Sequence, residues 1–131
     1  MKPWEEFRQK YPCGRSQFIT EVGYIGIIRI TGLDILCGYV VVPQYHPYFE
    51  KSLYNFDDTS LLELGVHGGV TFADYIDKDT YAIGFDCAHA DDYVPKLGAG
   101  LIPQTWKYEA FVRGEIEHLA EQLKEKELYN D

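Results

Sequence analysis

The sequence predicts an α+β fold, in which a mostly antiparallel β-sheet carries a long C-terminal helix on one face and has a short N-terminal helix beside it. The first observation is a set of apolar residues near the C-terminus at helical spacing, namely Val112, Ile116, Leu119 and Leu123. The second is that residues 18–30 and 35–42 are rich in Ile, Val and Tyr, as strands are. The chain has 131 residues, the size of one ordinary domain, so we expect a single domain over residues 1–131.

The N-terminal half contains a helix and two strands joined by a turn. In residues 3–9, Pro3 suits the first turn of a helix, and the apolar residues that follow have helical spacing. Residues 31–34 form a plausible hairpin turn between the two strands. The second strand, residues 35–42, is apolar on both faces, so we expect it at the centre of the sheet.

The middle of the chain is predicted to be more irregular. Residues 44–60 form a loop that is rich in aromatic side chains. Short strands are expected over residues 61–66, 70–72 and 81–87. Residues 91–105 hold two Pro and two Gly, and fit neither the helical nor the strand period, so they are expected to be a loop.

The chain is strongly acidic, with 21 acidic against 12 basic residues and a net charge of −9. This charge repels a phosphate backbone, so we do not expect direct binding to nucleic acid. The simplest interpretation is that the charge confers solubility. The alternative is an acidic face that meets a basic partner or mimics nucleic acid.

The cellular location is predicted from the lack of long apolar segments and from the pattern of the cysteines. No stretch has the apolar length of a signal peptide or a membrane span, so no membrane partner is expected. The cysteines Cys13, Cys37 and Cys87 are odd in number and lack CxxC spacing, which favours a reducing compartment and a cytoplasmic protein. The many tyrosines could also form the face of a homo-oligomer.

Polar residues gather where the strand at residues 81–87 ends. Asp86, Cys87, His89 and Asp92 lie on the way into a loop, where sheets usually place ligand-facing side chains. Strand alternation would place Cys87 and His89 on one face and Asp86 on the other. His89 could then act as a general base or activate the Cys87 thiol. The alternative is that Cys87 is a small buried residue.

A second polar motif surrounds paired glycines, Gly68 and Gly69, which are flanked by His67 and Thr71. Paired glycines within a strand pattern usually mark a bulge or a close approach of the backbone. They would leave backbone N–H groups beside His67 to hold an anion, and Thr71 would share a face with His67. The alternative is a bulge that only bends the sheet.

The sequence is also compatible with a metal site. Zinc, manganese or iron could use side chains from both motifs, and no dense motif such as HExxH is present. The ligands would have to come together from separate strands. The residues of suitable type are His67, Asp86, His89, Asp91 and Asp92. We leave any metal or cofactor unknown.

The chain resembles a widespread family of small, uncharacterised phage and bacterial proteins that share HGG(V/L)T(F/Y) and GFDCAH motifs. The resemblance rests on residues 37–40, on Pro43 and His46-Pro47, on residues 66–72, on residues 84–90 with Asp92, and on Val112 with residues 119–123. Asp91 departs from it, because a small residue is expected there. The resemblance implies a phage or prophage accessory protein in the host cytoplasm. Such proteins often block host enzymes, or sequester or degrade nucleotide signals, as anti-defence factors do.

The leading hypothesis is that the protein sequesters a small, nucleotide-derived anionic ligand in a pocket around the two motifs. Tyrosines of the aromatic loop would stack on a base, and the glycine N–H groups would hold phosphate. One alternative is a hydrolase with a Cys/His or metal site at the same residues, and another is an acidic inhibitor of a host enzyme. The predicted ligand-binding residues are Tyr45, His46, Tyr48, His67, Gly68, Gly69, Thr71, Asp86, Cys87, His89 and Asp92.

Overall fold

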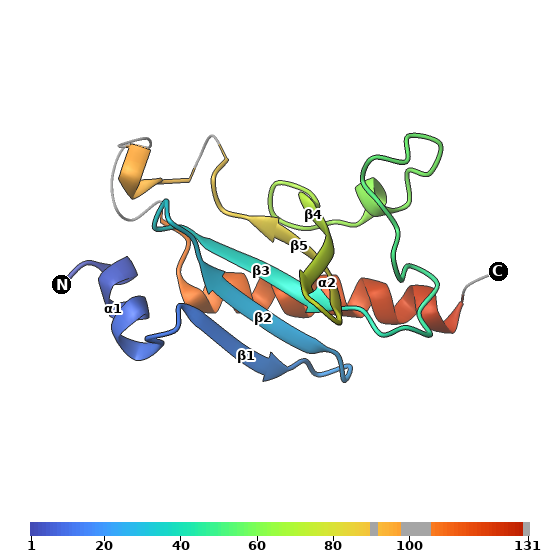
Figure 1. Cartoon of the computed structure of the whole chain (residues 1–131), viewed down its shortest axis with the longest axis horizontal. Helices are drawn as coiled ribbons and strands as arrows, with labels where there is room; N and C mark the ends of the chain where they lie inside the picture. The colour runs from blue at the N-terminus through green and yellow to red at the C-terminus, as the bar shows by residue number, and fades with distance from the viewer. Residues whose placement is uncertain (90–91, 98–105, 130–131) are drawn as a thin grey trace.

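The computed structural model of the chain describes residues 1–89, 92–97 and 106–129. It has a five-stranded sheet in the order β1-β2-β3-β5-β4, and every neighbouring pair is antiparallel. A long helix lies behind the sheet and a short one lies at its end (Figure 1), so the predicted α+β fold is confirmed. The helices and strands are α1 (Pro3–Lys10), β1 (Arg15–Ile19), β2 (Ile25–Ile30), β3 (Leu36–Val41), β4 (Phe72–Asp77), β5 (Thr80–Asp86) and α2 (Glu109–Leu128).

Helix α2 packs on the sheet through the apolar stripe read from the sequence. Val112, Ile116, Leu119 and Leu123 are all fully buried. Two strand glycines allow this close approach, because a Cβ at Gly26 or Gly38 would lie 2.9 Å from the Ile116 side chain. None of the described helices is long and apolar enough to cross a membrane.

The centre of the sheet agrees with the prediction. Strand β3 lies between β2 and β5, and five of its six residues are buried. The turn between β2 and β3 includes Asp34, whose φ of 62° is left-handed. The hydrogen bond from the Asp34 N–H to the Thr31 carbonyl closes this turn at 3.0 Å.

Three predicted strand boundaries are wrong. Residues 18–30 contain a turn between β1 and β2, which is closed by hydrogen bonds between Thr20 and Tyr24 and includes Gly23 at a φ of 97°. The predicted strand at 61–66 is instead a 3-10 turn, η1 (Leu61–Glu63), because the buried pair of leucines there has helical spacing. Strand β4 begins at Phe72, beyond the glycine pair.

The two predicted loops agree with the structure where it describes them, apart from one short 3-10 turn. Residues 44–60 contain turns and bends, with no helix or strand. Within the predicted loop at 91–105, residues 92–97 include a 3-10 turn, η2 (Pro95–Leu97). Residue 91 and residues 98–105 lie outside the described residues.

The sheet is curled enough for side chains of its two edge strands to reach each other. The Arg15 guanidinium of β1 lies 3.2 Å from the Asp77 carboxylate of β4, although these strands are at opposite edges. A flat sheet of five strands would hold them about 19 Å apart. The curl buries a second apolar cluster on the sheet face away from α2, centred on Ile27, Tyr39 and Ala82.

Candidate functional site

The two polar motifs pack directly against each other. Gly68 has a φ of 69°, and a Cβ built on it would lie 2.0 Å from Nε2 of His89. Only glycine therefore allows the His89 ring to occupy this position. The ring centroids of His67 and His89 are 5.4 Å apart at an angle of 75°. The paired glycines thus lie in a turn that makes room for a histidine, and not in a bulge within a strand.

Asp92 is the buried anchor of this cluster, with 1 % of its surface exposed. One carboxylate oxygen lies 2.9 Å from Nε2 of His67 and accepts the backbone N–H of His89 at 3.0 Å. The other oxygen lies 3.0 Å from Nζ of Lys107. Burial alone would raise the pKa of Asp92, but the hydrogen bonds from His67, His89 and Lys107 outweigh it, so the pKa lies below its usual value.

Each histidine ring is held through its Nε2 atom. Nε2 of His67 donates to Asp92, and Nε2 of His89 donates to the Asp86 carbonyl at 3.0 Å. Within the described residues, Nδ1 of neither ring has a hydrogen-bond partner. No buried side-chain nitrogen or oxygen is left without a partner there, so both Nδ1 atoms reach solvent. Each Nδ1 accepts a proton when its ring is neutral, and donates one when the ring is charged.

Helix α2 forms the other wall of the site. The backbone N–H of His67 donates to Oε1 of Glu115 at 2.7 Å, and the Phe111 ring stands perpendicular to the His67 ring at 5.2 Å. Our reading of the sequence missed Lys107, Phe111 and Glu115. Phe111 did carry a signal, because it is an aromatic residue outside the buried stripe of the helix. Lys107 and Glu115 look like ordinary surface charges in the sequence.

The side chains of Cys87 and Thr71 are not part of the site formed by the two histidines. The Cys87 side chain lies in the core with 2 % of its surface exposed, and burial raises the pKa of its thiol far above the usual value. Such a thiol is not a nucleophile at neutral pH. Thr71 is exposed, and its backbone N–H donates to the Gly84 carbonyl beside β4. Residues 67–71 do not form a strand, so Thr71 shares no strand face with His67.

The backbone N–H groups of the glycine pair are only partly available. The N–H of Gly69 donates to the Val66 carbonyl at 2.8 Å and closes the turn. An anion at this turn would therefore meet the histidine rings more than the glycine backbone.

The aromatic loop lies at the other end of α2. Nε2 of the buried His46 donates to the Leu123 carbonyl at 2.7 Å, and its Nδ1 accepts the backbone N–H of Tyr48 at 2.8 Å. Leu123 is twelve residues beyond Phe111, about 18 Å along the helix. Tyr48 is buried and Tyr45 is exposed. These three loop residues therefore do not stack over the histidine pair, as our sequence hypothesis required.

A metal centre has no support in the described part of the chain. No group of three or more His, Cys, Asp or Glu residues there is arranged to hold a metal ion. Asp91, one of the predicted ligands, lies outside the described residues.

No family model, curated protein or solved structure matches the chain. The resemblance to small phage and bacterial proteins therefore stays a prediction. The proposals below depend on the contacts within this chain.

Proposed function

We propose that the chain binds a small anionic ligand, nucleotide-derived in our hypothesis, at the surface formed by His67 and His89. The observation that carries the proposal is the pair of Nδ1 atoms that reach solvent from two neighbouring rings. When both rings are protonated, each Nδ1 donates a charge-assisted hydrogen bond, and two such donors suit a phosphate group.

The nearby carboxylates are already engaged by the protein. Asp92 faces Lys107 and His67. Glu115 and Asp86 each accept a backbone N–H, at 2.7 Å and 3.0 Å. These bonds reduce the repulsion that an incoming anion would otherwise meet. Both nitrogens of an imidazole ring donate only when the ring is protonated, so the proposed anion binding uses the charged form of the two rings.

Native mass spectrometry tests the proposal. The purified protein would be incubated with inorganic phosphate and with a panel of adenine and guanine nucleotides that includes cyclic dinucleotides. We expect one ligand to be retained per chain, and to be lost in His67→Ala and in His89→Ala. His118→Ala is the matched control, because His118 is an exposed histidine of α2. The proposal would be contradicted if both site variants retained the ligand as the parent does. It would also be contradicted if the parent retained no ligand from this panel.

A hydrolase remains the second candidate because of the His67–Asp92 pair. A buried carboxylate that holds Nε2–H leaves Nδ1 as an acceptor, which is the arrangement of a general base. Cys87 takes no part in this version, since its thiol is buried and protonated. The same spectra test it, because turnover would replace the ligand mass with product masses. An unchanged ligand after long incubation would exclude turnover of that ligand.

A further inference from the structure

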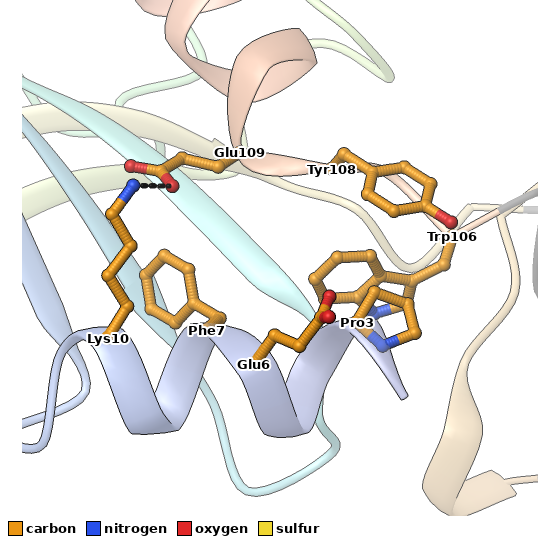
Figure 2. A pocket seen from close by; sticks show the side chains of 7 residues that line it. All are labelled: Pro3, Glu6, Phe7, Lys10, Trp106, Tyr108 and Glu109. Atoms are coloured by element: carbon orange, nitrogen blue, oxygen red, sulfur yellow. Dashed lines mark hydrogen bonds and ion pairs between the residues drawn. The ribbon is translucent and has the colours of Figure 1, made fainter. Parts of the chain in front are cut away.

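A hollow of about 210 Å³ lies between α1 and the start of α2 (Figure 2), and neither His67 nor His89 lines it. Its walls combine the rings of Phe7, Trp106 and Tyr108 with the charged side chains of Glu6, Lys10 and Glu109.

The aromatic wall of the hollow is held in place. Phe7 and Trp106 are buried, and the indole N–H of Trp106 donates to the Asp34 carbonyl at 2.7 Å. The Tyr108 ring stands nearly perpendicular to the Trp106 ring at 5.3 Å, and 48 % of Tyr108 is exposed. A ligand would thus meet preformed rings, with no cost of ordering them.

One carboxylate of the hollow lacks a partner. Lys10 lies four residues beyond Glu6 on α1 and could pair with it. Instead, Nζ of Lys10 lies 3.3 Å from Glu109, which also accepts the Tyr11 hydroxyl at 2.6 Å. Within the described residues, the carboxylate of Glu6 has no hydrogen bond or ion pair, although its backbone N–H donates to the Lys2 carbonyl. Glu6, Trp106 and Tyr108 all line this hollow, and Figure 2 shows Glu6 rising from α1 while Tyr108 lies at the start of α2.

We propose that this hollow binds the guanidinium group of an arginine side chain on a basic partner protein. Aromatic faces attract organic cations, and a guanidinium group stacks on rings while its N–H groups reach a carboxylate. An anion would instead meet two carboxylates against one ammonium group. The net charge of −9 would also attract a basic partner.

The hollow is separate from the proposed anion site. Lys107 reaches Asp92, whereas its neighbours Trp106 and Tyr108 line the hollow. Successive side chains of an extended segment point to opposite sides, and Tyr108 has extended backbone angles. Variants of Glu6 and Tyr108 therefore leave His67 and His89 in place, so either proposal can fail alone.

The test is an NMR titration of the whole chain with the peptide acetyl-Gly-Arg-Gly-amide, read at the indole N–H of Trp106. Two further peptides, in which citrulline or lysine replaces arginine, are titrated at the same ionic strength. We expect a saturable shift with the arginine peptide and none with the uncharged citrulline peptide. Glu6→Gln and Tyr108→Leu should each weaken binding about two- to fivefold.

Matched controls make the result decisive. Glu121→Gln makes the same charge change at an exposed position of α2, and Tyr54→Leu removes an exposed ring far along the chain. Both should bind the arginine peptide as the parent does. Equal binding of the citrulline peptide, parent-like binding by Glu6→Gln, or tighter binding of the lysine peptide would overturn the assignment.

Discussion

The contact between Gly68 and His89 predicts different results for two adjacent glycines. Gly68→Ala and Gly69→Ala both place an alanine at a left-handed backbone position, with φ of 69° and 85°. This strain costs about 1–2 kcal/mol in each variant. Only at Gly68 does the new Cβ meet another residue, because a Cβ at Gly69 has nothing within 4 Å.

The added cost at Gly68 can be derived from what His89 would lose. The His89 side chain is 28 % exposed, so its ring can rotate outward and avoid the clash. It then gives up the hydrogen bond to the Asp86 carbonyl, which contributes about 0.5–1.5 kcal/mol. We therefore expect Gly68→Ala to lower the free energy of unfolding by about 1 kcal/mol more than Gly69→Ala does.

Urea unfolding followed by tryptophan fluorescence measures both variants against the parent. A difference of 1 kcal/mol corresponds to about 3–5 °C in melting temperature for a chain of this size. NMR should show a moved His89 ring in Gly68→Ala alone. Equal destabilisation in the two variants, with an unmoved ring, would refute the interlocking of the two motifs.

Three further predictions concern the buried groups. In the native protein, a disulfide reagent should label Cys13 alone, because Cys37 and Cys87 are buried and their thiol pKa values are raised. Asp92→Asn should lower the free energy of unfolding by about 3–5 kcal/mol at neutral pH, since it leaves buried donors poorly paired. That difference should shrink below about pH 4, because a carboxyl with a depressed pKa stabilises the fold only while it is ionised. Gly38→Ala should cost about 1–3 kcal/mol, because its Cβ would lie 2.6 Å from the Phe85 ring.

Each of these predictions has a control and a contradicting result. Cys13→Ser should abolish the native labelling, and labelling of a second thiol before unfolding would show that the core opens. A difference between parent and Asp92→Asn that stays undiminished as the pH is lowered from about 4 to about 2 would mean that the carboxylate charge is not the cause. Gly32→Ala, whose Cβ would have nothing within 4 Å, should be within about 0.5 kcal/mol of the parent, and a similar loss in both glycine variants would contradict the packing argument.

The elements of the fold that have a strong period could be predicted from the sequence. The α2 stripe was correctly predicted because burial on one face leaves a helical period, and β3 was correctly predicted because its residue types favour strands and both of its faces are apolar. The strand predicted at 61–66 failed because Leu61 and Leu64 suit a short helical turn as well as a strand. Short apolar runs do not separate these alternatives.

The site was only partly predictable, for a physical reason. His67, His89 and Asp92 were named from two motifs that tertiary packing brings together through Gly68. Tyr45 was grouped with them by residue type alone, although loop geometry places its segment near the far end of α2. Phe111 comes to the site from a helix more than forty residues later in the chain, and no local pattern records that contact.

The curled sheet also has a consequence for the behaviour of the protein at high concentration. Exposed sheet edges are templates on which another chain can add a strand, which leads to aggregation. Here the β4 edge carries Asp74 and Asp77 and has an irregular register between Tyr75 and Asp77. Arg15 ties the opposite edge to Asp77. Charge, irregularity and this ion pair make the β4 edge a poor partner for edge-to-edge growth, so this edge should resist pairing with the sheet of another molecule.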